Sequence, residues 1–504
     1  MSISLLLEMA ASHDPERIAL IDDAHRWTVR GLSDLADGAA GAIQETDVEH
    51  VVYLGAGGAI LPLLLFASAR AGKAFTPINY RLSSAGIEAL LSRLPKALLV
   101  VDTRYRDAVT TRTHRIVDSD DFIVSAATAR AGHAPNEANE VSVVLFTSGT
   151  TSAPKAVELT HYNLTSYVMG TVDFASARAE DVALICVPPY HIAGVSAALS
   201  NIYAGRKMVY QQVFDAAEWV GLVQRESVTT ATVVPTMLDR ILTVLEQDDS
   251  VALPSLRTLA YGGSRVPLPL VRQAMNLLPD VGFVNAYGLT ETSSTIAVLT
   301  PQDHRDAHVA SDPRVARRLA SVGRTVPGVE AQIRDAVGNP LGPGETGELF
   351  VRGEQVSGRY TGIGSVLDDD GWFPTKDAAF IDQDGYMFIG GRQDDTIIRG
   401  GENIAPAEIE DVLIEHPDVH AVAVIGVEDA QWGQAIVAVV VPEAGSAPDP
   451  ERLRDHVRAA LRGSRTPDKV VFFTELPTTT TGKVLRREIA TALKHLTDQE
   501  AARA

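Results

Sequence analysis

The chain has 504 residues, more than one hydrophobic core usually organises, so two or more domains are expected. Hydrophobic residues make up 45% and charged residues 21%, which is typical of a folded globular protein and excludes an intrinsically disordered one. The 44 basic and 64 acidic side chains leave a net charge of −20, which opposes nonspecific binding to nucleic acid or to an anionic membrane.

The N-terminal segment makes a poor signal peptide, because residues 1–8 contain no basic residue and their leucines end at an acid, Glu8. The apolar run at 61–67 is far shorter than the about 20 residues that span a bilayer. We therefore expect a cytoplasmic protein without stable membrane insertion. The single cysteine, Cys186, lies in an apolar run, which predicts a buried structural thiol. The histidines show no zinc-type spacing.

The first half of the chain alternates between apolar extended segments and helical patterns. Residues 50–110 follow this scheme loosely, with extended segments at 51–54 and 97–101 and a helical stretch ending near residue 71. Residues 140–290 follow it regularly, with strand and helix pairs at 182–187 and 192–203, 229–234 and 237–245, and 256–261 and 268–278. The alternation predicts parallel α/β sheets, which bind ligands beyond the carboxyl ends of their strands.

A loop rich in hydroxyl groups and glycine follows the apolar strand predicted at 141–146. Residues 145–155 read Leu-Phe-Thr-Ser-Gly-Thr-Thr-Ser-Ala-Pro-Lys, and a helix is predicted to start at residue 161. Backbone N–H groups and hydroxyls at the end of a buried parallel strand converge on an anion, so the loop predicts a phosphate site. A mobile Ser/Thr/Gly loop is the alternative that composition leaves open. The order of a Walker P-loop is missing.

The second half of the chain has a different pattern of predicted secondary structure. From about residue 320, short strands and Gly/Pro turns predict a β-rich subdomain. Beyond it, helices predicted at 407–416 and 450–461 and extended segments at 419–427 and 435–441 form a smaller unit. The predicted fold class is α/β, with a large N-terminal domain of parallel α/β sheets and a small mobile α+β C-terminal domain. We place the N-terminal domain at residues 1–391, its β-rich subdomain at about 320–391, a hinge at 392–396 and the C-terminal domain at 397–504.

Five further motifs follow the loop in order. They are Tyr-Gly-Leu-Thr-Glu at 287–291, Thr-Lys-Asp at 375–377, Gly-Arg-Gln-Asp at 391–394, Gly-Gly-Glu-Asn at 400–403 and Thr-Gly-Lys at 481–483. Together with the loop, they resemble the adenylate-forming superfamily, which includes acyl-CoA synthetases, adenylation domains of peptide synthetases and beetle luciferases. The resemblance extends over essentially the whole chain, from residues 72–79 to Lys483. It implies an enzyme that activates a carboxylic acid as an acyl adenylate.

The resemblance implies a nucleotide site built from several motifs. In it, Lys155 and the loop hold the β- and γ-phosphates of ATP, and Tyr287 stacks on adenine. Asp377 accepts both ribose hydroxyls, because the two oxygens of a carboxylate accept two hydrogen bonds at once. Arg392 reaches ribose or phosphate. The full implied set of ATP/AMP-binding residues is Thr147, Ser148, Gly149, Thr150, Thr151, Lys155, Gly262, Gly263, Ser264, Asn285, Ala286, Tyr287, Gly288, Asp377 and Arg392.

Three residues have catalytic roles in the same resemblance. Joining a carboxylate to a phosphate brings two anions together, so the site must neutralise charge. Thr290 is the hydroxyl that contacts the α-phosphate, and Glu291 is the carboxylate that binds Mg²⁺. Lys483 is the mobile lysine that reaches the reacting carboxylate, and a compact ammonium on a flexible stem suits that task. The implied substrates and cofactors are a carboxylic acid, ATP, Mg²⁺ and CoA.

The remaining assignments concern the acyl pocket, CoA and the hinge. His191 resembles the aromatic position that borders the acyl pocket, although a histidine in an apolar stretch is also typical of a core. Asp394 matches the hinge position. The loop of Gly400, Gly401 and Glu402 resembles the one that borders the tunnel for the thiol arm of CoA. The implied acyl pocket is His191, Val195, Thr236 and Thr292, with Ser196, Arg265 and residues 293–295 near its walls.

Two departures from the family pattern affect the expected rate rather than the fold. Ser152 and Ala153 stand where the loop commonly has a glycine and a further residue, and loss of glycine restricts φ. Lys376 stands where glycine often precedes the ribose aspartate. These departures suggest a catalytically weak adenylate-binding protein as one alternative.

Our leading interpretation is an AMP-forming carboxylate:CoA ligase. An acyl-AMP ligase that loads a carrier protein is the alternative within the superfamily. A serine hydrolase is a further alternative, because residues 194–198 loosely resemble a nucleophile elbow around Ser196. The moderate length of the chain favours a small, medium-chain, aromatic or alicyclic acid over a very long chain, which fits roles in fatty acid and lipid metabolism among others. A homodimer is compatible with the sequence.

Overall fold

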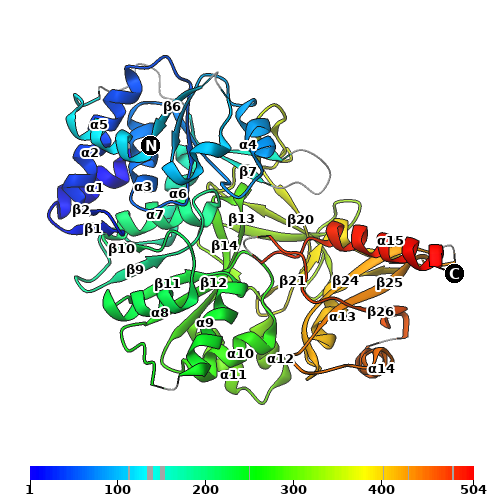
Figure 1. Cartoon of the computed structure of the whole chain (residues 1–504). Coiled ribbons are helices and arrows are strands. Elements are labelled where there is room, and N and C mark those ends of the chain that lie inside the picture. The colour runs from blue at the N-terminus through cyan, green and yellow to red at the C-terminus, as the bar shows by residue number, and fades with distance from the viewer. Residues whose placement is uncertain are drawn as a thin grey trace.

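The computed structural model describes every residue except 112–113, 133–139, 148–153, 249, 401, 430, 462, 480–481 and 504, with the backbone alone for 403 and 496–503. Two large sheets with their covering helices form the N-terminal body, and a smaller C-terminal unit lies along one side of it (Figure 1). In that view the C-terminal unit, orange to red, lies beside the segments coloured green and yellow.

An eight-stranded sheet contains the strands predicted at 51–54, 97–101 and 141–146. Its order is β19-β18-β8-β7-β4-β3-β5-β6, and β3, β4, β5, β6 and β7 are mutually parallel where they pair. The bounds are β3 (His50–Leu54), β4 (Ala74–Ile78), β5 (Ala97–Val101), β6 (Arg115–Asp118), β7 (Val141–Thr147), β8 (Lys155–Thr160), β18 (Arg359–Tyr360) and β19 (Gly364–Ser365).

The phosphate loop is followed by a strand rather than directly by a helix. β7 and β8 form an antiparallel pair with Thr147 opposite Lys155, and α6 (His161–Thr171) begins only after β8 has returned across the sheet. β7 and β8 are therefore the two strands of a hairpin. The helix predicted to start at residue 161 is confirmed, but a strand that the sequence pattern did not predict, Lys155–Thr160, separates it from the loop.

A nine-stranded sheet holds the regular α/β alternation. Its order is β15-β14-β13-β12-β11-β9-β10-β1-β2, and the neighbours from β13 to β1 are parallel, which confirms the predicted parallel sheet. The bounds are β1 (Ile18–Ile21), β2 (Arg26–Thr28), β9 (Val182–Ile185), β10 (Lys207–Tyr210), β11 (Thr230–Val233), β12 (Thr258–Gly262), β13 (Gly282–Leu289), β14 (Ser294–Leu299) and β15 (Arg324–Thr325).

Helices cover both sheets, and three-residue to six-residue 3-10 turns connect several elements. The helices of the N-terminal body are α1 (Ser4–His13), α2 (Val29–Gln44), α3 (Ile60–Arg70), α4 (Ser84–Leu91), α5 (Ser119–Thr128), α6, α7 (Ile192–Ala204), α8 (Ala216–Arg225), α9 (Pro235–Gln247), α10 (Leu268–Leu277), α11 (Pro301–Val309) and α12 (Pro313–Ala316). The 3-10 turns are η1 (Thr103–Ala108), η2 (Thr290–Thr292), η3 (Arg317–Ala320), η4 (Gln393–Asp395) and η5 (Gly463–Arg465).

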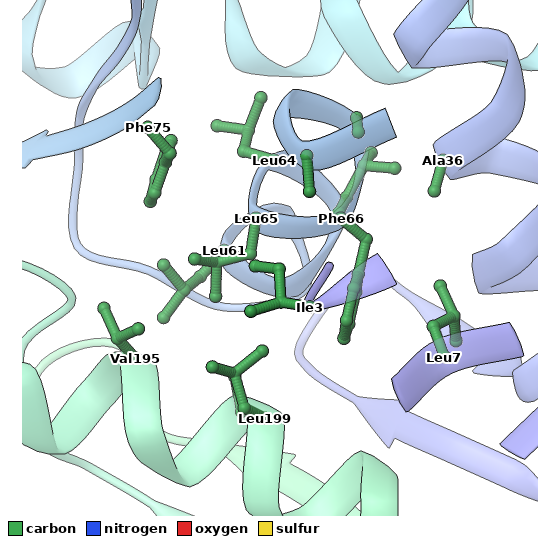
Figure 2. Packing of buried hydrophobic residues seen from close by; sticks show 14 of the residues in the cluster. Ile3, Leu7, Ala36, Leu61, Leu64, Leu65, Phe66, Phe75, Val195 and Leu199 are labelled. Atoms are coloured by element: carbon green, nitrogen blue, oxygen red, sulfur yellow. The ribbon is translucent and has the colours of Figure 1, made fainter. Parts of the chain in front are cut away.

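The largest core cluster joins the two sheets through α3 and α7. Figure 2 shows Leu61 and Phe66 of α3 packed with Ile3 and with Val195 and Leu199 of α7. Each of these side chains is at most 2% exposed, and burying one contributes about 1.5–3 kcal/mol. This apolar bridge fixes the relative position of the loops that leave the two sheets.

The predicted structural role of Cys186 is confirmed. Its side chain is buried next to β9, and burial raises the pKa of the thiol to about 12. A thiol that stays protonated at neutral pH is a poor nucleophile.

The β-rich segment and the C-terminal unit have their own sheets. β16 (Glu330–Arg334), β17 (Gly347–Arg352), β20 (Phe373–Ile381) and β21 (Met387–Arg392) form an antiparallel sheet, and η4 leads from it into the C-terminal unit. The elements of that unit are β22 (Ile397–Arg399), β23 (Glu402–Ile404), α13 (Pro406–Leu413), β24 (Val419–Asp429), β25 (Gly433–Pro442), α14 (Pro450–Ala460), β26 (Lys469–Phe472) and α15 (Arg486–Arg503).

The predicted fold class is confirmed, since a large N-terminal domain with parallel α/β sheets precedes a small C-terminal domain with a separate core around Ile409, Val424 and Leu453. Within the part of the chain that the structure describes, no helix has both the length and the apolar character needed to cross a membrane.

Candidate active site

The predicted phosphate and metal residues lie on either side of one tyrosine. The Lys155 ammonium sits 5.4 Å from the centre of the Tyr360 ring, and the Tyr360 hydroxyl donates a 2.9 Å hydrogen bond to the Glu291 carboxylate. Tyr360 occupies this place because β18 pairs with β8, with Tyr360 opposite Val157. A cation and a carboxylate that are distant in sequence thus both contact Tyr360.

The predicted ribose aspartate lies in a network with two other predicted residues. Asp377, on β20, is 6% exposed; it accepts a 2.5 Å hydrogen bond from the Tyr287 hydroxyl and lies 3.2 Å from Arg392 Nε. Arg392 also donates to the Thr375 carbonyl at 2.7 Å. Burial raises the pKa of Asp377, while Arg392 and the Tyr287 hydroxyl act in the opposite direction. The carboxylate is thereby oriented, with a cation at its side.

The segment after β13 turns sharply and holds Glu291 in place. The Glu291 carbonyl accepts a 2.8 Å hydrogen bond from the Ser357 N–H, and Thr290 begins the η2 turn. Thr292 is fully buried, and its hydroxyl bonds to the carbonyls of Leu289 and Ser294. Thr292 therefore stabilises the turn from within.

Two of the predicted glycines lie where a side chain has no room. A Cβ on Gly262 would come 2.2 Å from the Ala286 carbonyl oxygen, and one on Gly288 would come 1.9 Å from the Ser294 carbonyl oxygen. Gly263, which follows Gly262, has φ +81°, a conformation that favours glycine. Asn285 donates to the Ser321 carbonyl at 3.1 Å. Close backbone packing thus shapes the strand ends of β12 and β13.

Lys483 approaches this network from the C-terminal unit. It sits in a hairpin closed by hydrogen bonds between Thr479 and Lys483 and between Leu485 and Pro477. Loss of solvation and the nearby Arg392 lower the pKa of the Lys483 ammonium, whereas Asp395 and Asp377 raise it. The structure therefore brings the predicted catalytic lysine within electrostatic range of the predicted ribose aspartate.

The loop of Lys483 rests on the N-terminal body. A Cβ on Gly482 would lie 2.9 Å from Thr236 Cγ2 and 3.6 Å from Ser264 Oγ. Thr236, at the start of α9, and Ser264, after β12, thus touch the segment that carries the lysine. Their predicted roles in the acyl pocket and the nucleotide site remain predictions, and the structure shows both at the contact between the two units.

His191 lies directly before α7, whereas Val195 lies within its first turn. The His191 ring packs 4.6 Å from the Tyr190 ring, and burial, followed by the charge of Arg81, lowers the pKa of His191 to about 4. The imidazole is therefore neutral at pH 7. Val195 is fully buried in the core between the sheets (Figure 2), where it contacts the cluster around Leu61.

The predicted CoA loop lies within the C-terminal unit. The Gly400 N–H donates to the Trp432 carbonyl at 2.8 Å, and Gly400 has φ +56°. The Glu402 carboxylate pairs with Arg465. Asp394, the predicted hinge, is exposed in η4 between β21 and β22. Gly400 and Glu402 thus both have contacts within the C-terminal unit.

Some predicted residues lie outside the described part of the chain. They are Ser148, Gly149, Thr150 and Thr151 of the phosphate loop, with Ser152 and Ala153, and Gly401 of the predicted CoA loop.

The structure explains one departure and argues against one alternative. Lys376 has φ +64°, a left-handed conformation that accounts for the glycine commonly found at that place.

Ser196 lies inside helix α7 and bonds to the Ala193 carbonyl and the Ser294 hydroxyl. A nucleophile elbow requires a serine on a strand-to-helix turn, so the hydrolase interpretation is not supported.

The sequence did not indicate Tyr360 as a residue of the site, nor the partners of Arg265. Tyr360 is part of a strand of two residues, which carries too little periodicity to be recognised. Arg265, predicted near an acyl pocket wall, donates to the Ala407 carbonyl of α13 at 3.2 Å and to Asp411. Neither partner is near in sequence, so only the fold reveals these contacts.

Comparison with known sequences identifies the family. The profile of AMP-binding enzymes matches residues 7–361, and that of the AMP-binding enzyme C-terminal domain matches residues 408–483. The chain is 31% identical to indoleacetate–CoA ligase of Aromatoleum aromaticum, over 97% of this chain and 98% of the relative. It is 34% identical to feruloyl-CoA synthase of Amycolatopsis, over 91% and 92%. It is 31% identical to the fatty acid–[acyl-carrier-protein] ligase ScoC of Streptomyces coeruleorubidus, over 95% and 94%.

Solved structures agree with this result. ATP-bound MatB from Rhodopseudomonas palustris superposes with a TM-score of 0.86 at 26% identity, covering 98% of this chain and 100% of that one. The o-succinylbenzoate CoA synthetase MenE from Bacillus subtilis, in complex with its acyl-adenylate intermediate, gives 0.82 at 27% identity, covering 96% and 97%. With two family profiles, full-length relatives and the shared fold, the chain belongs to the AMP-binding enzyme family, within the adenylate-forming superfamily that its motifs resemble.

Proposed function

We propose that the protein is an AMP-forming carboxylate:CoA ligase. The observation that carries this proposal is the contact of Gly482, next to Lys483 in the C-terminal unit, with Thr236 and Ser264 of the N-terminal body. In the first half-reaction, an oxygen of the substrate carboxylate attacks the α-phosphorus of ATP and pyrophosphate leaves. In the second, the CoA thiolate attacks the acyl carbonyl and AMP leaves.

In the first half-reaction, positive charge from both units offsets the two anions. Lys155 would hold the β- and γ-phosphates, which leave as pyrophosphate. Lys483 would contact the substrate carboxylate while the negative charge of that carboxylate is transferred to the α-phosphate. Asp377 would accept the ribose hydroxyls, with Arg392 keeping it ionised and oriented. The Lys483 amine must carry its proton to neutralise the carboxylate. Because its pKa is lowered, adenylation should slow as the pH rises.

The residues present fit one Mg²⁺ held mainly by ATP. Mg²⁺ in nucleotide sites takes one or two carboxylates and completes its shell with phosphate oxygens and water. Glu291 offers one carboxylate, and among the described residues no cluster of three or more His, Cys, Asp or Glu side chains forms a metal cage. Glu291 would therefore hold the ion, and the ion would neutralise phosphate charge.

The second half-reaction needs a different arrangement of the C-terminal unit. Gly400 and Glu402 contact Trp432 and Arg465, within the C-terminal unit. Rotation at the segment 392–396, with Asp394 as the hinge, would bring this loop to the site for the CoA thiol. An acyl-carrier protein is the competing acceptor, and the similarity to a carrier-protein ligase keeps that alternative in the test.

We propose an aromatic acid as the first substrate class to examine. Relatives at 31% and 34% identity are named for indoleacetate and ferulate. One relative is named for fatty acids, so medium-chain fatty acids form the second class.

A panel of aromatic, alicyclic and medium-chain acids tests the proposal. We expect acid-dependent exchange of radioactive pyrophosphate into ATP, and release of AMP that needs CoA for turnover. Turnover with an acyl-carrier protein and none with CoA would support the carrier-protein ligase. Absence of exchange with every acid, although the protein binds ATP in calorimetry, would support an adenylate-binding protein without activity.

A further inference from the structure

The loop that follows β12 contacts the C-terminal unit through two consecutive residues. Ser264 lies against Gly482, and Arg265 lies against helix α13. The guanidinium of Arg265 donates to the Ala407 carbonyl at 3.2 Å, bonds to the Asp411 carboxylate and lies 3.9 Å from the Glu410 carboxylate. One arginine therefore spans the first and second turns of α13.

The contact continues from α13 to the hairpin that carries Lys483. The Glu410 carboxylate accepts hydrogen bonds from the Arg486 guanidinium at 2.5 Å and from the Val424 N–H at 2.8 Å. Arg486 begins α15 immediately after that hairpin and also lies 3.6 Å from Asp395, next to the predicted hinge. Glu410 is only 13% exposed, so this inner pair is shielded from solvent more than the outer one.

We infer that Arg265 is a positioning residue for Lys483, holding the C-terminal unit in the arrangement in which that lysine reaches the nucleotide site. This inference rests on the proposed function of Lys483 in acid adenylation. Arg265 lies on the N-terminal body, while Asp411, Glu410 and Arg486 move with the C-terminal unit. The Arg265–Asp411 pair must therefore break when the unit rotates, whereas the Glu410–Arg486 pair inside the unit can persist.

The pair affects the two half-reactions in opposite ways. It stabilises only the arrangement with Lys483 at the site, because a ligand or contact shifts an equilibrium by its difference in affinity for the two states. Its loss should slow adenylation and leave the transfer from a supplied acyl adenylate unchanged or faster. A purely structural role would lower both steps together.

Label distances test the inference without any acid substrate. The single native cysteine is buried, so spin labels on Asn276→Cys in α10 and Arg452→Cys in α14, both exposed, report the distance between the two units. In Arg265→Asp we expect the population at the wild-type distance to fall about threefold to tenfold. The double variant Arg265→Asp/Asp411→Arg should restore it, and Arg265→Lys should restore it in part.

The rate of pyrophosphate exchange, which reports the first half-reaction, provides the second readout. With an acid accepted by the wild type, pyrophosphate exchange should fall about threefold to tenfold in Arg265→Asp and recover in the charge-swapped double variant. Arg225→Asp is the matched control, because Arg225 is 56% exposed, like Arg265 at 41%, and pairs with Glu218 inside the N-terminal body. It should change neither readout.

The inference is overturned if the label distances of Arg265→Asp equal those of the wild type, or if the double variant Arg265→Asp/Asp411→Arg restores neither readout relative to Arg265→Asp. Failure of the proposed function has a different signature. No acid would then support pyrophosphate exchange in the wild type, while the label distances would still respond to the charge changes.

Discussion

Gly482 lies against Thr236 so closely that a Cβ on the glycine would come 2.9 Å from Thr236 Cγ2. The glycine belongs to the C-terminal unit and the threonine to α9 of the N-terminal body. Gly482 also has φ +74°, which a residue with a side chain adopts only at a cost. The position directly before Lys483 is thus restricted both by its own backbone and by the other unit.

Gly482→Ala should therefore impair adenylation selectively. We expect pyrophosphate exchange to fall about tenfold or more, because the left-handed backbone and the close contact each cost about 1 kcal/mol. Gly445→Ala is the matched control: Gly445 has φ +81° in the same unit, but open space around its Cβ position. Equal losses in both variants would show that contact with Thr236 has no role.

Lys483→Ala should separate the two half-reactions. Removing a charge that acts only on the adenylation transition state should lower pyrophosphate exchange about 100-fold or more. Conversion of a supplied acyl adenylate to acyl-CoA should continue near the wild-type rate. Parallel loss of both steps, measured by single-turnover kinetics, would contradict the role of this lysine.

Asp394→Pro should impair the thioester step more than adenylation. Proline fixes φ near −65°, so it would restrict the rotation proposed for the η4 segment. We expect the rate of acyl transfer from the adenylate to CoA to fall about tenfold or more, with pyrophosphate exchange nearly unchanged. If rapid-quench kinetics show both rates at wild-type values, the hinge does not lie at Asp394.

Lys376→Gly should stabilise the protein. Lys376 has φ +64°, and relief of a left-handed backbone is worth about 0.5–1 kcal/mol after the greater freedom of glycine in the unfolded chain is counted. Its 3.6 Å pair with Glu348 is exposed on the lysine side and contributes little. Urea denaturation should show a higher midpoint for Lys376→Gly and none of that gain for the control Lys376→Ala.

The half-buried His191 should make stability depend on pH. Folding lowers its pKa from 6.5 to about 4, so the unfolded chain binds the extra proton first as the solution is acidified. Stability present above pH 6.5 is then lost as the pH falls, by about 2 kcal/mol at pH 5. His161, whose pKa is also lowered to about 4, adds a loss of the same sign.

The contribution of His191 is isolated by comparing variants. Between pH 7.5 and pH 5, His191→Phe should lose less unfolding free energy in urea titrations than the wild type. His308→Phe, a change at an exposed position, serves as the control and should follow the wild-type pH dependence. An identical pH dependence in all three proteins would exclude His191 as a source.

The local pattern of residues determined much of the fold. Regular alternation predicted α10 as residues 268–278, and the structure has Leu268–Leu277. The β7–β8 hairpin was missed because one apolar strand followed by a polar loop looks alike whether the next segment is a strand or a helix. Strand pairing decides that difference, and it depends on residues far away in the chain.

The sequence by itself determined the family and the set of chemical groups, because six ordered motifs supply phosphate-binding hydroxyls, a ribose carboxylate and two lysines. Only the tertiary structure decided which of these groups meet. Tyr360 contacts Lys155 and Glu291, and Arg265 contacts helix α13, so these contacts join residues that are 69 to 205 positions apart in the sequence. Such contacts come from the packing of two sheets and a second unit, and local propensity carries no information about them.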